Sequence, residues 1–125
     1  MIRKSLIGAA LIAFVNLLML VAPAHAGGST ANCGPIPRQS FCSVEVIDSP
    51  GGTLAADFDV YGGSIPDITL NWHVDGPGGQ VRWCSGTFRM SDPPQSWLCH
   101  GLNPGYARLT VNKDVSAHAW AGLRW

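Results

Sequence analysis

The sequence predicts a small all-β protein: an antiparallel β-sandwich of about seven short strands, immunoglobulin-like or fibronectin-like in architecture, with two disulfides. Three observations lead to this prediction. Apolar and polar residues alternate with period two through most of the chain, Gly- and Pro-rich turns interrupt the alternation at short intervals, and four cysteines occur among 125 residues. Alternation gives each strand one dry and one wet face, which favours antiparallel pairing.

The expected strands follow one another between clear breaks. They cover residues 41–48, 54–61, 68–75, 80–90, 97–100, 106–112 and 116–125. Turn-forming residues separate them, most clearly Gly76-Pro77-Gly78-Gly79 and the Pro93-Pro94 pair. The inward positions of these strands predict a core of Val44, Val46, Leu54, Phe58, Val60, Leu70, Trp72, Leu109 and Val111.

The first 26 residues have the three parts of a secretory signal peptide. A basic start at Arg3 and Lys4 precedes an apolar run over residues 6–21, and Ala24-His25-Ala26 fits a cleavage site. Residues 27–40, rich in Gly, Pro, Ser and Asn, then predict an extended N-terminal arm before a sandwich domain over residues 41–125. We expect a secreted or periplasmic protein that is free of the membrane after signal removal.

The charge of the expected mature chain argues against a nucleic-acid partner. Removing residues 1–26 leaves 99 residues and takes away two of the eight basic residues and none of the eight acidic ones, so the net charge is −2. Binding driven by phosphates needs a basic face, and this chain has too few basic residues to make one.

The four cysteines, Cys33, Cys42, Cys84 and Cys99, predict two disulfides, because they are an even number in a short exported domain. Four cysteines allow three connectivities. Proximity along the chain favours Cys33–Cys42 and Cys84–Cys99. A structural zinc site is disfavoured because the sequence has no C-x-x-C motif.

Residues 102–109, Leu-Asn-Pro-Gly-Tyr-Ala-Arg-Leu, resemble the L-x-P-G-x-Y-x-V stretch that precedes a late strand in many immunoglobulin-like and fibronectin-like domains. In those domains the tyrosine forms a corner that bonds back to the backbone. Here Tyr106 follows Gly105 directly, without the intervening residue. This departure moves Tyr106 to the other face of the strand.

The sequence contains no catalytic or cofactor motif of the common hydrolase, zinc-protease, P-loop or dinucleotide-binding types, and it predicts neither a cofactor nor an enzyme. The sequence predicts a weak cation site only if two neighbouring strands pair. Asp57 and Asp59 face outward on one of them, and His73 and Asp75 face outward on the next.

Five tryptophans supply the strongest functional signal. Trp72 and Trp125 lie in phase with apolar neighbours and are expected in the core. The other three are candidate ligand contacts, and His118 and Arg124 share the predicted outward side of Trp120; the candidate site is Trp83, Trp97, Trp120, His118 and Arg124.

The chain is therefore predicted to be a non-catalytic binding module for a glycan, a cell-wall polymer or a protein. The first alternative is a secreted protease inhibitor that presents the loop 90–96. The second is a small hydrolase, which would need a histidine and an acid to meet in a pocket.

Overall fold

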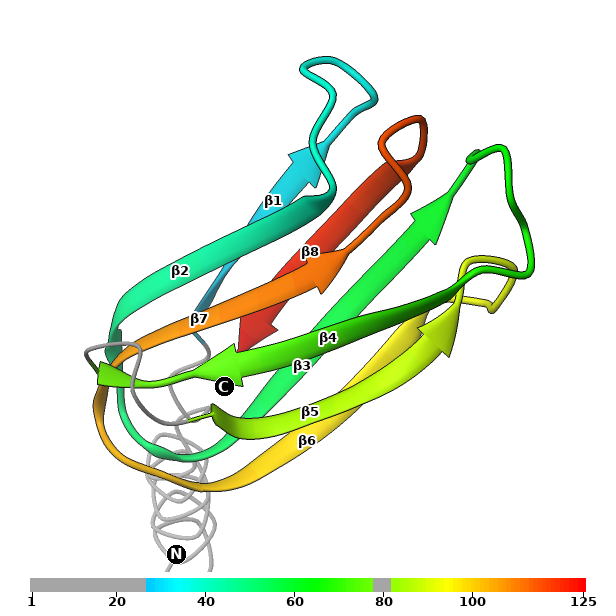
Figure 1. Ribbon diagram of the computed structural model, residues 1–125. Helices are drawn as coiled ribbons and strands as arrows, with labels where there is room; N and C mark the ends of the chain where they lie inside the picture. Colours follow the sequence, from blue (N-terminus) through cyan, green and yellow to red (C-terminus); the bar gives the residue numbers. More distant parts are fainter. Residues whose placement is uncertain (1–26, 78–81) are drawn as a thin grey trace, which may run out of the picture.

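The computed structural model in Figure 1 describes residues 27–77 and 82–125, apart from the side chains of Arg82 and Trp83. Eight strands make up the fold: β1 (Gly28–Cys33), β2 (Phe41–Ser49), β3 (Gly52–Tyr61), β4 (Thr69–Asp75), β5 (Arg82–Arg89), β6 (Gln95–Leu102), β7 (Gly105–Asn112) and β8 (His118–Arg124). The all-β class predicted from the alternation is confirmed. The expected signal segment lies outside the described residues. Within the described part, no helix is long and apolar enough to cross a membrane.

The strand β1 lies inside the segment expected to be an extended arm. It pairs antiparallel with β8 along its whole length, from Gly28 opposite Arg124 to Cys33 opposite Ala119. Its residues are small and polar and show no apolar alternation, so the sequence carried little signal for it. Backbone hydrogen bonds to β8 are what make this segment a strand, and the sandwich therefore starts at β1 and not at Phe41.

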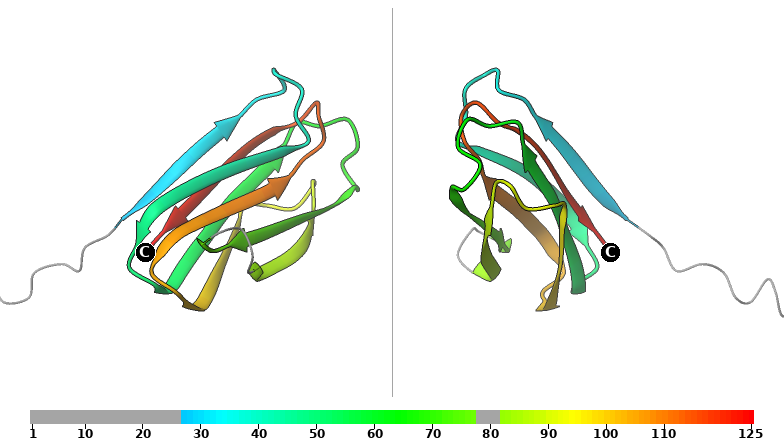
Figure 2. Two further views of the ribbon diagram at one scale, coloured as in Figure 1. Left: turned by 60° about the vertical axis from the view of Figure 1, so that its left-hand side comes forward. Right: turned by 90° about the vertical axis from the view of Figure 1, so that its right-hand side faces the viewer.

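The strands form two four-stranded antiparallel sheets, β1-β8-β3-β6 and β2-β7-β4-β5. Figures 1 and 2 show the two layers stacked face to face. The first strand pairs with the last, the second with the seventh, the third with the sixth and the fourth with the fifth, as in one long folded-over hairpin with β4 and β5 at its closed end. Additional pairing of β8 with β3 and of β7 with β4 rolls that hairpin into a sandwich.

This order is that of a jelly roll. The predicted β-sandwich class is thus confirmed, while the strand order differs from the immunoglobulin arrangement of A-B-E-D against C-F-G. Tyr106 behaves as its spacing indicated. Its neighbour Ala107 points into the core, and Tyr106 lies half-buried on the outer face of the β2-β7-β4-β5 sheet.

The core lies between the two sheets and contains all nine of the predicted residues. At its centre, the ring of Phe58 on β3 lies against Trp72 on β4 and Phe88 on β5, with ring centroids 5.7 and 4.9 Å apart. Gly86 on β5 makes room for Trp72, since a Cβ atom there would stand 2.8 Å from the indole nitrogen.

Both disulfides have the predicted connectivity, and both join one sheet to the other. Cys33 on β1 is bonded to Cys42 on β2, and Cys84 on β5 is bonded to Cys99 on β6, with Cα–Cα distances of 5.7 and 5.9 Å. Because β1 and β2 are edge strands on one side and β5 and β6 are edge strands on the other, the disulfides close both sides of the sandwich.

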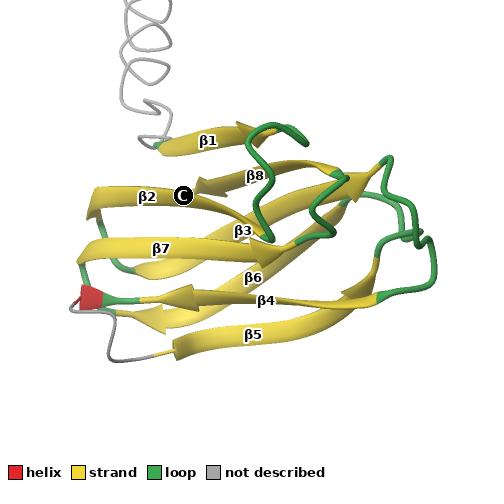
Figure 3. Ribbon diagram, turned by 45° about the horizontal axis from the view of Figure 1, so that its top comes forward, coloured by secondary structure: helices red, strands yellow, loops and turns green. Residues whose placement is uncertain are grey.

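The longer loops lie together at one end of the sandwich (Figure 3). Asp114, in the loop between β7 and β8, accepts hydrogen bonds from the backbone and hydroxyl of Ser64, in the loop between β3 and β4. At the other end, β2 turns into β3 through Gly51 and Gly52. Both have positive φ (79° and 81°), a conformation that favours glycine.

Candidate binding surfaces

The structure separates the tryptophans that were expected to cluster. Trp97 lies on the edge strand β6 and faces the inside of the sandwich, where its ring stacks on Trp72 with centroids 5.9 Å apart, and it remains 47% exposed. Trp120 points the other way, to the outer face of the same sheet. Trp83 lies in β5, but its side chain is outside the described residues. Trp97 and Trp120 therefore do not form one surface.

Trp120 occupies the outer face of β8, as its phase predicted. Its neighbours Ala119 and Ala121 are buried on the inner face. The six-membered edge of the indole lies over Gly122, because a Cβ atom on that glycine would be 3.4 Å from both Cζ2 and Cη2 of the ring. Trp120 is half-buried as a result. Part of the residue remains exposed on this outer face.

A second pair of rings stands beside Trp120. Tyr61 on β3 is the cross-strand partner of His118 on β8, and the two rings are stacked at 5.4 Å with planes only 10° apart. Asp59 on β3 and Asn32 on β1 lie opposite Trp120 on its two neighbouring strands. We call the surface formed by Asn32, Asp59, Tyr61, His118 and Trp120 the Trp120 face.

Arg124, a predicted site residue, has a structural partner on this sheet. Its Nε atom donates to Oδ2 of Asp57 at 2.7 Å, and the hydroxyl of Ser96 on β6 donates to Oδ1. Burial raises the pKa of Asp57, but the hydrogen bonds from Arg124 and Ser96 and the charge of Arg124 outweigh burial and lower it. The three side chains bridge β8, β3 and β6, and Arg124 borders the Trp120 face without being a free cation on it.

The lowered pKa of Asp57 predicts a loss of stability in acid. A carboxylate with a lower pKa in the folded than in the unfolded state stabilises the fold above its ordinary pKa of 3.8, and this contribution is lost as the pH falls through the folded value. The melting temperature of Asp57→Asn should therefore fall less than that of the wild type between about pH 4 and pH 2. An equal fall in circular-dichroism melts would contradict this assignment.

The cation site that Asp57, Asp59, His73 and Asp75 could have formed does not exist. It required the two strands to pair, but β3 and β4 belong to different sheets, so the two pairs of side chains lie on opposite outer faces. Among the described residues, no group of three or more His, Cys, Asp or Glu side chains is arranged to hold a metal ion.

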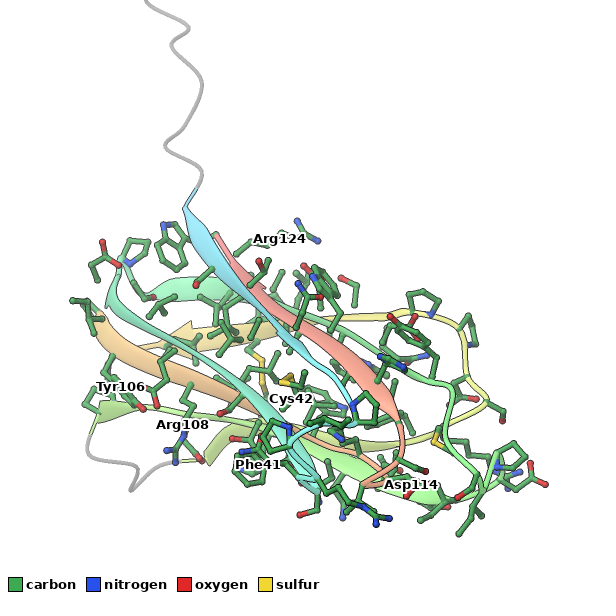
Figure 4. The ribbon with its side chains drawn as sticks, turned by 90° about the horizontal axis from the view of Figure 1, so that it is seen from above. Phe41, Cys42, Tyr106, Arg108, Asp114 and Arg124 are labelled. Atoms are coloured by element: carbon green, nitrogen blue, oxygen red, sulfur yellow. A yellow bond between two sulfur atoms is a disulfide. The ribbon has the colours of Figure 1, made fainter. Side chains whose placement is uncertain are left out.

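His73 and Asp75 instead form part of a polar cluster on the outer face of β2-β7-β4-β5. His73 Nε2 lies 3.2 Å from Asp75 Oδ2, and Nη2 of Arg108 on β7 lies 3.6 Å from the same oxygen. Figure 4 shows Arg108 and Tyr106 on one side of the sandwich and Arg124 on the other, with Cys42 between them. Beside the cluster is a shallow hollow of about 320 Å³, lined by Asn71, Trp72, His73, Ser85, Gly86, Thr87 and Asn112.

This hollow brings a histidine and an acid together, which was the condition set for a hydrolase. Ser85 is the cross-strand partner of His73, so a hydroxyl, an imidazole and a carboxylate share one face. A serine nucleophile needs a base within hydrogen-bond reach. The imidazole of His73 is directed at Asp75, with Nε2 3.2 Å from Oδ2.

The first half of the loop 90–96, which a protease inhibitor would present, is hydrogen-bonded to neighbouring segments. The backbone nitrogens of Met90 and Ser91 donate to the carbonyls of Ile68 and Pro66 at 3.2 and 2.9 Å, and Met90 is buried. Asp92 accepts from the backbone of Arg89 at 2.8 Å. The loop is thus packed on the neighbouring loop over part of its length.

The chain matches no sequence-family model and no curated protein sequence. Three solved structures are similar in fold. A chain of the disulfide-linked pili that form Bacillus endospore appendages is 7% identical, with 83% of this chain and 92% of that chain covered and a TM-score of 0.40. The carbohydrate-binding module TmCBM61, solved in complex with β-1,4-galactotriose, is 11% identical, with 83% and 88% covered and a TM-score of 0.45. The mitogen of Yersinia pseudotuberculosis is 9% identical, with 80% and 84% covered and a TM-score of 0.42.

These proteins are similar to the chain only in their β-sandwich architecture. The class defined here is a disulfide-closed β-sandwich with polar and aromatic groups on both outer faces. Evidence for its function has to come from those faces.

Proposed function

We propose that the protein is a non-catalytic module that binds a glycan through the Trp120 face. The supporting observation is the combination of a partly exposed Trp120, whose ring edge lies by Gly122, with the parallel Tyr61–His118 stack next to it. Aromatic rings on the outer face of a sheet can contact a ligand directly. Tyr61, at 53% exposed, extends the same surface.

The chemistry of this face suits a sugar. The C–H face of a pyranose is apolar and packs on a flat aromatic ring, while its hydroxyls need polar partners at the ring edge. Asp59 and Asn32, on the strands that flank Trp120, supply a carboxylate acceptor and an amide that both donates and accepts. Both the aromatic platform and its polar rim are therefore carried on three adjacent strands of one sheet.

We place this activity outside the cytosol. Both disulfides are formed and cross-link the two sheets, and structural disulfides persist in oxidising compartments. A secreted or periplasmic module would meet glycans on cell surfaces or in cell walls.

Trp120→Ala is the direct test. We expect binding to an array of neutral oligosaccharides, including β-1,4-galactotriose and cello-oligosaccharides, to weaken at least about tenfold, because the variant removes the stacking surface. The free energy of unfolding should fall by only about 1 kcal/mol, because Trp120 lies on the outer face of the sheet and outside the core cluster.

Trp97→Ala provides the matched control. It removes a tryptophan from the inner side of the same sheet that stacks on the core residue Trp72, so it should cost stability and leave binding intact. If the wild type binds no oligosaccharide on the array, or if Trp120→Ala binds as well as the wild type, the proposal is wrong. The same face would then be expected to bind a protein ligand.

A further inference from the structure

The hollow on the opposite outer face has the features of a second ligand site. It lies across β7, β4 and β5, with a volume of about 320 Å³, at the lower end of the range for small-molecule sites. Its polar side chains come from all three strands. Asn112 on β7 lies next to Asn71 on β4, which is opposite Thr87 on β5, and His73 is opposite Ser85.

Most of the polar side chains of the hollow are open to solvent. Asn71, Ser85 and Thr87 are exposed, and Asn112 is partly exposed. They offer two amides and two hydroxyls, each of which can both donate and accept. Because these four residues lie in paired strands, their backbone positions are fixed before a ligand binds, which lowers the entropic cost of binding.

His73 has a different role from these four residues because its position is fixed. Its Nε2 atom lies 3.2 Å from Asp75, whose side chain is only 8% exposed. Arg108 approaches the same carboxylate from the β7 side. The imidazole therefore forms a fixed wall of the hollow.

The composition of the lining identifies the class of ligand. Amides and hydroxyls without a net charge recognise a neutral molecule with many hydroxyl groups, and the volume limits it to about one ring. The described residues that line the hollow include no lysine or arginine, the side chains that a phosphate or carboxylate ligand would favour. Phe41, 44% exposed on β2 and opposite Asn112, adds an apolar group at the margin.

We infer that this hollow binds a single neutral monosaccharide unit, independently of the Trp120 face. The two sites lie on opposite outer faces of one sandwich, so one molecule could hold two glycan chains at once. This inference does not depend on the proposed function, because it rests on different residues in a different sheet.

Titration followed by ¹H–¹⁵N correlation spectra tests both sites separately. D-galactose, D-glucose, D-mannose and N-acetyl-D-glucosamine are added to the protein at millimolar concentrations. At least one should shift the backbone amides of Asn71, Ser85, Thr87 and Asn112 in a saturable way. The double variant Asn71→Ala/Asn112→Ala should weaken that binding about tenfold or more, since it removes two hydrogen-bonding groups.

Two further variants control the experiment. Thr69→Ala changes an exposed residue of β4 that does not line the hollow, and it should titrate like the wild type. Trp120→Ala should retain the shifts in the hollow, which separates this inference from the proposed function. The inference is overturned if none of the four sugars shifts the amides of the hollow, or if the double variant, with a wild-type spectrum elsewhere, binds with unchanged affinity.

Discussion

Replacing Phe58 by alanine should lower the free energy of unfolding by about 3–5 kcal/mol, a large part of the stability of a domain of this size. Phe58 is completely buried, and it lies on β3, an internal strand of its sheet. Its ring contacts Trp72 and Phe88 of the opposite sheet. Removing it leaves a cavity between the sheets that the disulfide-closed edges cannot readily collapse to fill.

Asp59→Ala is the matched control for Phe58→Ala. Asp59 is the next residue of the same strand and points to the outer face, where a truncation typically changes stability by no more than about 0.5 kcal/mol. Urea denaturation with linear extrapolation measures both values. Similar losses for the two variants would show that the inward and outward positions of β3 had been exchanged. Asp59→Ala is also expected to weaken glycan binding, because Asp59 belongs to the Trp120 face.

Reduction of the two disulfides should have the second large effect. Cys33 and Cys42 are separated by 9 residues and Cys84 and Cys99 by 15. In the chain-entropy treatment, each cross-link of this length destabilises the unfolded state by about 3 kcal/mol. Both bonds also join the two sheets, so their loss frees both edges of the sandwich. We expect the reduced protein to be unfolded or nearly so at physiological temperature.

Double variants separate the two bonds. Cys33→Ala/Cys42→Ala and Cys84→Ala/Cys99→Ala should each lose about 2–5 kcal/mol in urea denaturation. Non-reducing peptide mapping of the wild type should show only the two expected linkages. A reduced protein whose stability remained within about 1 kcal/mol of the oxidised one would show that the sheets hold together without the cross-links.

The two outer faces differ in the way they would select a ligand. The Trp120 face is flat and aromatic and would accept an extended chain, whereas the hollow is small and polar and would accept one ring. Binding at the first should depend on Trp120 and binding at the second on Asn71 and Asn112. Independent sites on opposite faces would allow the module to connect two glycan strands.

The sequence alone determined which side of each strand is buried in the core. Period-two alternation placed Phe58 and Leu109 inward and Trp120 outward, because a β-strand projects successive side chains to opposite faces. Short separations along the chain also indicated the cysteine pairs, since nearby residues meet at the lowest entropic cost. These properties are local, and local patterns are what a sequence displays directly.

Only the tertiary structure decided which strands share a sheet. Alternation distinguishes inside from outside but carries no information about partners, so it could not show that Asp57 and His73 lie on opposite faces of the sandwich. It could not show that Trp97 would lie on an edge strand, because strand order decides which strands end a sheet. The hollow has the same origin. Its side chains come from β4, β5 and β7. The pairing of β4 with β7 joins residues nearly forty positions apart in the sequence. This pairing is made by backbone hydrogen bonds, which do not depend on residue type, so the sequence pattern does not reveal it.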